Sequence, residues 1–313
     1  MQIANESPIA FRSSATRPGA LTLVLAAARE VWSRRRLIGY MVRAEVKKKG
    51  ANTVLGNLWW VIDPLLAAGV YVIVMSLIFA RSIPDFALFL LAALVPYKWF
   101  TATIGDTTSS VRTQVSLIKQ IQFPKIVLPI VSAGAEVVNF AFAMLVLVVI
   151  MVIGAATNVL DNHLSLMLLW VPVIAAIQFV FSLGIATMLS AVTVFYKDVG
   201  IFVGHLMRLL FWVSPILWTF DLLDTGRGAA LHEALGDVGM SVLQFNPIAI
   251  LLNSYRHVIY GQLAINKNGE DVWTAPIAPD LVLLGIVLVI GIVVCILGTW
   301  VFKRLEPSFA KVL

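Results

Sequence analysis

The stretch LVLLGIVLVIGIVVCILGTWVF, residues 281–302, carries no charged side chain. A helix of about 20 mainly apolar residues is long enough to cross the roughly 30 Å of hydrocarbon in a bilayer. Hydrocarbon offers no water to open backbone groups, so a spanning segment of this kind must be helical. The stretch therefore predicts a membrane-spanning helix and, with it, an all-α membrane protein.

Composition extends this prediction to the whole chain. Of its 313 residues, 60% are hydrophobic and only 13% are charged, whereas soluble domains carry about 25% charged residues. The six predicted spans cover residues 58–80, 86–104, 127–156, 166–194, 200–220 and 281–302. Together they form one transmembrane domain, residues 58–313, which is preceded by a mixed apolar and basic segment, residues 1–57.

The distribution of Lys and Arg predicts how the spans are oriented, because cytoplasmic loops carry an excess of basic residues. With the N-terminus in the cytoplasm, seventeen basic residues are cytoplasmic and three, Arg81, Arg227 and Lys267, are external. Both termini are therefore predicted to be cytoplasmic. The net charge of +6 reflects this asymmetry and does not indicate nucleic-acid binding.

The apolar run from Ala20 to Ala28 resembles a signal peptide, but Arg29 and the Arg34–Arg36 cluster come directly after it. A positive cluster at this position opposes export of the downstream chain. Apolar residues recur at helical spacing with arginines between them, which predicts an amphipathic helix in the cytoplasmic membrane interface. A solvated basic tail held by anionic lipid is the alternative.

Residues 112–129, between the second and third predicted spans, are too polar to cross the membrane and too apolar for a loop that is fully exposed to solvent. The string LIKQIQFP, residues 117–124, predicts a short amphipathic cytoplasmic helix that ends at Pro124. Such a helix would present a docking surface to a partner.

Residues 221–280 form a long external segment in which acidic residues outnumber basic ones. Between residues 247 and 260 the apolar positions recur at helical spacing, but this part is too short for a clean span. We expect an external re-entrant or interfacial helix there, before the last span.

Two charges fall about half way along predicted spans, Lys98 in the second and Arg208 in the fifth. A charge at this depth costs about 2.5–3.5 kcal/mol on insertion scales and marks a candidate functional residue. Both could line a hydrated path for an anionic substrate. The alternatives are snorkelling to the interface or pairing with a buried carboxylate such as Glu136.

Tyr71, Tyr97 and Phe100 lie deeper than the aromatic belts that mark membrane interfaces. Their ring faces could stack on sugars, a contact that many sugars share because it uses an apolar face. Ser214-Pro215 interrupts the fifth span and frees a backbone carbonyl, so the break must face protein or water. It suits a channel-lining element, or a kink that serves packing alone.

Several other function classes lack their motifs in this sequence. There is no Gly-rich Lys-Ser or Lys-Thr phosphate loop, and the four histidines are scattered without a zinc or nucleophile motif. The single cysteine, Cys295, can form neither an intrachain disulfide nor a cysteine metal cluster. No metal, cofactor or catalytic residue is therefore expected in the chain.

A set of short motifs carries a family resemblance. They are TVLGNLWWVIDP at 53–64, VPYKWF at 95–100, LIK at 117–119 with FPK at 123–125 and Pro129, YKDV at 196–199, SPI at 214–216, and Asn246-Pro247 with Tyr255-Arg256 and Gly261. In this order they resemble ABC type-2 export permeases for polysaccharides, the Wzm-like exporters of O-antigen, teichoic acid, capsule and cell-wall galactan. Lys48-Lys49-Gly50-Ala51 and Lys98 depart from the family's pattern.

The resemblance implies a permease subunit of the bacterial inner (plasma) membrane that exports an undecaprenyl- or decaprenyl-linked glycan. It also implies a homodimer with two cytoplasmic ATPase subunits, which would hold the ATP and Mg²⁺. The residues that it implies for docking of the ATPase are Leu117, Ile118, Lys119, Phe123, Pro124 and Lys125.

Three further sets of residues are predicted from the resemblance and from the charges and aromatics above. The glycan path would include Tyr71, Tyr97, Lys98, Phe100, Arg208, Ser214 and Pro215. The entrance for the lipid pyrophosphate would be formed by Arg34, Arg35, Arg36, Lys47, Lys48 and Lys49. The external re-entrant element would include Asn246, Pro247, Tyr255 and Arg256.

Three rival functions compete with export of a glycan. The first is an ABC type-2 permease for a drug or a lipid. The second, from another class, is a membrane enzyme acting on lipid-linked sugars, which would turn over substrate without a partner. The third is a secondary transporter, which usually has an inverted repeat, and no internal repeat is visible here.

Overall fold

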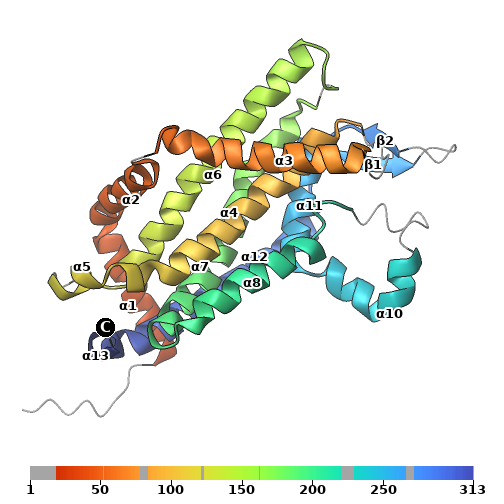
Figure 1. The fold of residues 1–313 in the computed structure, drawn as a ribbon. Coiled ribbons are helices and arrows are strands. Elements are labelled where there is room, and N and C mark those ends of the chain that lie inside the picture. The colour runs from red at the N-terminus through yellow and green to blue at the C-terminus, as the bar shows by residue number, and fades with distance from the viewer. Residues whose placement is uncertain are drawn as a thin grey trace, which may run out of the picture.

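A computed structural model describes residues 19–51, 53–77, 84–120, 123–161, 163–219, 229–265 and 271–312. The described part is almost entirely helical, as predicted (Figure 1). Its helices are α1 (Ala20–Ser33), α2 (Arg35–Gly50), α3 (Trp59–Leu77), α4 (Phe86–Thr113), α5 (Val115–Gln120), α6 (Val127–Ala156), α7 (Val171–Phe195), α8 (Asp198–Val213), α10 (Ala229–Gln244), α11 (Pro247–Ile259), α12 (Leu281–Leu305) and α13 (Phe309–Val312). Short 3-10 turns are η1 (Gly56–Leu58), η2 (Leu166–Trp170) and η4 (Glu306–Ser308).

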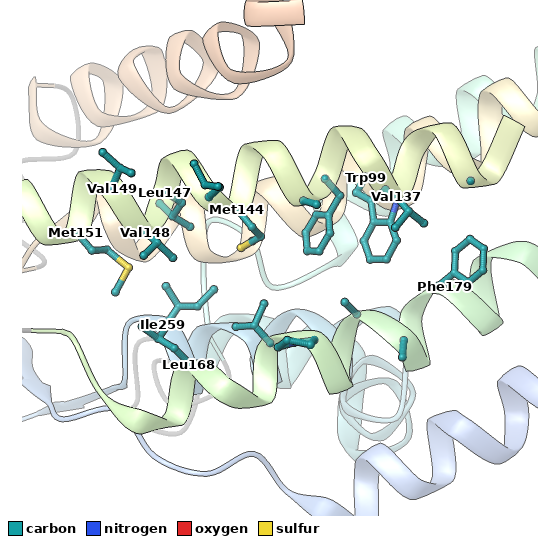
Figure 2. A pocket seen from close by; sticks show the side chains of 18 residues that line it. Trp99, Val137, Met144, Leu147, Val148, Val149, Met151, Leu168, Phe179 and Ile259 are labelled. Carbon is teal, nitrogen blue, oxygen red and sulfur yellow. The ribbon is translucent and has the colours of Figure 1, made fainter. Parts of the chain in front are cut away.

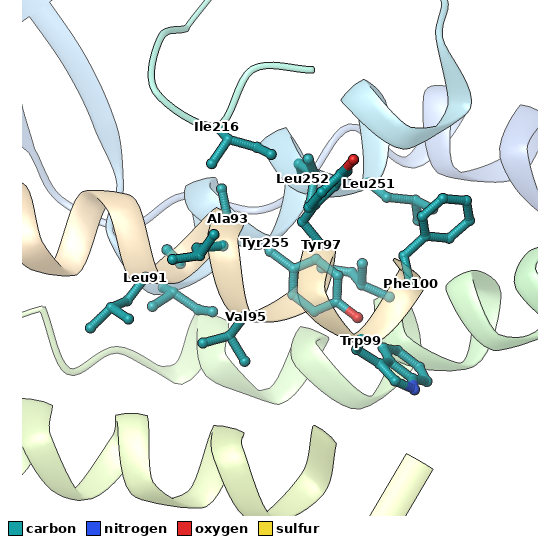
Figure 3. Packing of buried hydrophobic residues seen from close by; sticks show 14 of the residues in the cluster. Leu91, Ala93, Val95, Tyr97, Trp99, Phe100, Ile216, Leu251, Leu252 and Tyr255 are labelled. Carbon is teal, nitrogen blue, oxygen red and sulfur yellow. The ribbon is translucent and has the colours of Figure 1, made fainter. Parts of the chain in front are cut away.

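Helix α4 is the centre of the fold. It packs against α3, α6, α7, α8 and α11, and from Leu88 to Phe100 every side chain except that of Lys98 is buried. Figure 3 shows side chains of α4 next to Leu251 and Tyr255 of α11. The other long helices therefore surround α4, and each exposes more of its own surface.

Four helical segments are long and apolar enough to cross a membrane: Phe86–Thr113, Val127–Ala156, Leu166–Phe195 and Leu281–Ser308. They correspond to the second, third, fourth and sixth predicted spans. The apolar part of α3, Val61–Val74, is shorter, and residues 78–80 of the first predicted span lie outside the described residues. Helix α8 ends at Val213, before the Ser214-Pro215 break. The count of six spans therefore remains a prediction.

Helix α4 continues to Thr113, beyond Ile104, where the second span was predicted to end. Polar residues such as Thr107 and Ser110 ended the apolar pattern, yet they are buried. The Ser110 hydroxyl donates to the Thr107 carbonyl at 2.7 Å. A hydroxyl that bonds within its own helix can be buried without another partner, so the helix tolerates Ser110.

Helices α1, α2, α5 and α13 gather at one end of the molecule, which we call the basic end (Figure 1). The single interface helix predicted here is in fact two helices, α1 and α2, because the backbone leaves helical geometry at Arg34. The Ser33 hydroxyl donates to the Glu30 carbonyl at this point and so competes with the helical backbone bonds.

The opposite end of the molecule carries α10, α11 and a hairpin of β1 (Gln262–Ile265) and β2 (Asp271–Thr274) (Figure 1). The strands are antiparallel, with Gln262 opposite Thr274. The sequence pattern did not predict this hairpin, because strands of four residues give little periodic signal. Helix α11 confirms that the apolar spacing between residues 247 and 260 is helical, and nearly all of its faces are buried. Whether it re-enters the membrane stays a prediction.

Helices α7 and α12 approach each other closely at three glycines. Gly184 of α7 lies against the backbone of Cys295, and Gly291 and Gly298 of α12 lie against the backbone of α7 at Phe181 and Gly184. Small residues allow membrane helices to pack backbone to backbone, where dispersion contacts replace the hydrophobic effect. These glycines therefore hold the last span on the fourth.

A methyl group at Gly184 would lie 2.5 Å from the Cys295 backbone nitrogen, so Gly184→Ala should force α7 and α12 apart. We expect the free energy of unfolding to fall by about 1–3 kcal/mol, measured as a lower thermal midpoint of the purified protein. Gly285→Ala on α12 is the matched control, because a methyl group there meets nothing within 4 Å. Equal midpoints for the two variants would contradict the close packing.

Candidate functional site

The predicted docking segment lies at the basic end. Leu117 and Ile118 on α5, and Phe123 after it, are half-buried against an apolar cluster that joins α1, α4, α7, α12 and α13. Lys119 is exposed, and Pro124 and Lys125 are half-buried. Residues 121 and 122 lie outside the described residues, so where the helix ends before Pro124 is not described. The segment presents a charged outer face on an apolar base.

Glu306 fastens this segment to the last span. Its Oε1 accepts a hydrogen bond from the Lys125 backbone nitrogen at 2.8 Å, and its Oε2 pairs with Lys303 at 2.6 Å. Lys303 also pairs with Glu30 of α1 at 2.6 Å. The docking segment, α1 and α12 therefore meet in one charged cluster, and a displacement of the segment would reach all three.

The predicted pyrophosphate entrance is spread along α2. The Arg34–Arg36 cluster is at the start of the helix and Lys47–Lys49 at its end, which places the two clusters about 20 Å apart at 1.5 Å per residue. Arg35 covers the ring of Trp32, with 5.3 Å between its guanidinium carbon and the ring centroid. One pyrophosphate cannot contact both clusters, so the structure does not bring the predicted entrance residues together.

Lys49 differs from the other entrance residues, because it is engaged inside the protein. Its ammonium contacts the carboxylates of Glu136 on α6 and Asp106 on α4. Burial alone would lower the pKa of Lys49, but the two carboxylates outweigh burial and hold this pKa above its ordinary value. We refer to these three residues as the Lys49 cluster. It ties the end of α2 to two central helices.

The aromatic residues of the predicted glycan path pack within the core. Phe211 of α8 stacks on Tyr71, with 5.8 Å between ring centroids, and meets the edge of Tyr97 at 5.6 Å. Phe100 is buried against Phe181 of α7. Tyr97 and Phe100 thus lie inside this conformation, and a glycan could reach them only if helices moved. Arg208 is exposed on α8.

Lys98 of α4 points toward α3. Its ammonium pairs with Asp63 of α3 at 2.7 Å, and both side chains are partly exposed. Sequence analysis placed Lys98 on the glycan path and left pairing with a buried carboxylate such as Glu136 as an alternative. The partner is Asp63, while Glu136 belongs to the Lys49 cluster. Lys98 and Asp63 line a cavity of about 410 Å³ between α3, α4 and α6, which we call the α3–α4–α6 cavity.

A larger groove of about 940 Å³ runs between α6 and α7 (Figure 2). Its lining is apolar, with side chains such as Val137, Met144, Leu168 and Phe179 directed into it from α6, η2 and α7. Trp99 of α4 lines both this groove and the α3–α4–α6 cavity. The groove lies on two helices that can span a membrane, so hydrocarbon chains are its natural contents.

The break after α8 is satisfied by Arg256, which sequence reasoning had placed only in the external element. Arg256 is 2% exposed. Its guanidinium donates to the carbonyls of Ile216 at 2.9 Å and Trp218 at 3.3 Å, and it lies 4.1 Å from the centroid of the Phe89 ring. Ser214 and Pro215 are buried. The break therefore faces protein, which favours packing over a channel lining in this conformation.

Asn246 caps the start of α11, and Tyr255 anchors its buried face. The Asn246 side chain accepts a hydrogen bond from the Ile248 nitrogen at 3.0 Å, and Pro247 occupies the first turn, where it needs no N–H donor. Tyr255 is fully buried and meets the edge of Phe140 on α6. These residues give α11 a defined start and anchor it to the spans.

No metal site accompanies these features within the ranges that the structure describes, because no three His, Cys, Asp or Glu side chains there could hold an ion. The arrangement is that of a membrane bundle with a charged cluster under its docking segment.

Comparison with known proteins gives this bundle its family. The ABC-2 type transporter family matches residues 36–227, from α2 to beyond α8. The chain belongs to the ABC-2 type transporter family.

Relatives of the transporter include proteins named O-antigen export system permease protein RfbA. One from Klebsiella pneumoniae is 27% identical over 278 residues, which cover 88% of this chain and 95% of the relative. Another from Myxococcus xanthus is 28% identical over 233 residues, which cover 74% of this chain and 83% of the relative. The docking, path and entrance roles named above remain predictions for this transporter.

The Lys49 cluster gives a test of how α2 is held. Lys49→Met would leave the Glu136 side chain, 5% exposed, without its cation, and we expect the free energy of unfolding to fall by up to about 3 kcal/mol. Thermal unfolding of the purified transporter measures this loss. Lys48→Met is the matched control, since Lys48 is exposed and its ion pair within the described ranges is with Glu45, at 3.6 Å.

The double variant Lys49→Met with Glu136→Gln should recover most of the lost stability, because no buried charge is then left alone. The cluster does not hold α2 if Lys49→Met unfolds at the same temperature as Lys48→Met.

Proposed function

We propose that the chain is the membrane-spanning permease of an ABC exporter for a lipid-linked polysaccharide of the O-antigen, teichoic acid or cell-wall galactan type. Membership in the ABC-2 type transporter family supports the transport role. The names of the relatives, which align over most of the chain, support a polysaccharide as the cargo.

Energy would come from a separate ATPase that docks at the basic end. The observation that carries this proposal is the docking segment itself. Its Lys119 is exposed to solvent, whereas Leu117, Ile118 and Phe123 are half-buried against the apolar cluster below. Glu306 links the same segment to α12. A partner that moved the segment would bias the packing of the spans, which is the requirement for coupling.

A second copy of the chain would complete the conduit, with two ATPase subunits below it. Helices α3 and α8 carry large exposed apolar side chains, among them Val70, Ile73, Phe202, Leu209 and Trp212. In the proposed homodimer these faces lie near the partner copy. The glycan would pass between copies of α3, α4 and α8, and opening of that path would expose Tyr71, Tyr97 and Phe100.

The membrane would be the bacterial inner (plasma) membrane, with both termini cytoplasmic. The excess of Lys and Arg at the basic end supports this orientation. Arg34, Arg36 and Lys47 remain available there to attract the pyrophosphate of a polyprenyl carrier, whereas the charge of Lys49 is balanced by Glu136 and Asp106.

The apolar α6–α7 groove favours one alternative, an ABC-2 permease for a lipid or an apolar drug. Its volume of about 940 Å³ would hold such a molecule without any sugar. This alternative predicts transport of the apolar compound and no dependence on a glycan.

Proteoliposomes that contain the permease, its ATPase and a lipid-linked glycan test the proposal. The variant with Phe123→Ala and Pro124→Gly should loosen the docking segment from its apolar base. We expect ATP hydrolysis to persist while glycan exported per ATP falls about tenfold, the size of a typical coupling free energy. Val152→Ala, at an exposed position on α6, is the control and should export normally.

Wild-type coupling in the double variant would contradict the docking role. Proteoliposomes with the unaltered complex that move a lipid or drug but no glycan would contradict the proposed cargo.

A further inference from the structure

The apolar α6–α7 groove is longer than one leaflet of a bilayer is deep. On α6 its lining begins at Gly134 and ends at Met151, with contributions from every turn between them, which at 1.5 Å per residue is about 25 Å. A helix tilted by about 40°, the upper end of the usual range, would still carry the groove through about 19 Å of membrane. Half of the hydrocarbon thickness is only about 15 Å. The groove therefore extends through parts of both leaflets.

The two ends of the groove lie toward the two ends of the molecule. A methyl group at Gly134 would lie 3.1 Å from Cγ2 of Val42 on α2, so this part of the groove is next to the basic end. Met151, Leu168 of η2 and Ile259 of α11 lie together at the other end (Figure 2). The groove thus runs along the spans.

The groove also reaches below the surface of the bundle. Trp99 of α4 and Ile259 of α11 are on its lining, although they are only 5% and 1% exposed. Met144 and Leu147 line it from α6 and are 8% and 3% exposed. A chain in the groove would therefore be contacted from several sides, whereas the outer face of a helix contacts a lipid chain from one side only.

The chemistry of the lining selects a hydrocarbon as the ligand. Of the lining side chains only that of Trp99 carries a nitrogen or oxygen atom. A sugar or a phosphate in this groove would leave its polar groups without partners, at a high cost in free energy. The groove consequently fits the lipid part of a lipid-linked molecule and excludes its polar part.

Length and shape favour a polyprenyl chain over the acyl chains of phospholipids. An acyl chain ends near the middle of the bilayer, whereas a polyprenyl chain of ten or eleven isoprene units is long enough to follow the groove through both leaflets. The lining also combines large side chains, such as Met144 and Phe179, with the small ones of Ala141, Ala175 and Ala176. Recesses beside the alanines suit the methyl branches that a polyprenyl chain carries and an acyl chain lacks.

Basic residues lie near the end of the groove where a carrier phosphate would be. Arg43 directly follows Val42 on α2, and Lys47 lies one turn further along the same helix. Both side chains are exposed and can attract a phosphate at the membrane surface. The neighbouring apolar groove and these cations together match a long hydrocarbon chain with a phosphate at one end.

We propose that the α6–α7 groove holds the polyprenyl chain of the lipid carrier while its glycan is exported. The inference rests on the proposed lipid-linked cargo, and it adds the place where the lipid part of that cargo binds. Lipid tails gain no hydrophobic free energy when they move from bilayer to protein, so the chain is held by close packing in the groove.

Retention of undecaprenyl phosphate by the complex of permease and ATPase measures this site. The complex is reconstituted into phosphatidylglycerol vesicles with a small fraction of radiolabelled probe and purified again in detergent, and the retained probe is counted per complex. Farnesyl phosphate, with a short chain, and hexadecyl phosphate, with an unbranched chain, are the comparison probes. We expect both to be retained about tenfold less, because they make fewer dispersion contacts in the groove.

A steric variant locates the probe. Ala141→Phe with Ala176→Phe places one ring on each wall of the groove, at positions that are exposed. We expect the retained undecaprenyl phosphate to fall about tenfold, because the rings displace part of the chain from its contacts. Val138→Phe with Val173→Phe is the matched control, since these side chains of α6 and α7 are 43% and 45% exposed outside the groove lining, and it should retain the probe normally.

The outcomes separate this inference from the proposed function. Equal retention by the groove variant and the unaltered complex overturns the groove site and leaves polysaccharide export intact. Hexadecyl phosphate retained as well as undecaprenyl phosphate, or loss of the probe in the control variant, also overturns it. If the double variant fails to assemble, Ala176→Phe alone decides. Unaltered complex that exports no glycan in proteoliposomes overturns the proposed function and this inference with it.

Discussion

Hydrocarbon supplies no hydrogen bonds, and the packing of this bundle is largely a response to that constraint. Where α8 is broken at Ser214-Pro215, Arg256 from a helix 40 residues later donates to the Ile216 carbonyl. Where Pro96 lies inside α4, the Gln178 amide of α7 donates to the Pro96 carbonyl at 2.9 Å. The two prolines thus mark points at which helices are joined, because near each of them a side chain of a different helix donates to a backbone carbonyl.

The same constraint explains why so few charges are buried and why each matters. Glu136 lies on α6 with Lys49 and Asn139 as partners, and this arrangement ties the end of α2 to α6. At the basic end, Glu306 joins the docking segment to α12 through Lys125 and Lys303. Glycine contacts then couple α12 rigidly to α7. Contacts therefore run without a gap from the docking segment through Glu306 and α12 to α7.

The sequence predicted the parts of this structure that depend on local pattern. Apolar length located the four helices that are long and apolar enough to cross a membrane, and helical spacing located α11, since both signals come from neighbouring residues. The ion-pair partner of each charged side chain could not be predicted from local sequence. Pairing with a carboxylate was one alternative for Lys98, yet nothing local distinguishes Asp63 from Glu136, and Lys49 reaches Glu136 across 87 residues of sequence. The role of Arg256 was missed for the same reason, although a proline break always implies some donor nearby.

The central claim is that this chain supplies the conduit and the docking segment, while a separate ATPase supplies the energy. The most direct test reconstitutes the purified chain in liposomes with lipid-linked glycan and ATP, first alone and then with its ATPase. We predict that the chain alone neither hydrolyses ATP nor moves or alters the glycan, and that both hydrolysis and export begin when the ATPase is added. Hydrolysis of ATP, or chemical modification of the glycan, by the chain alone would contradict the account.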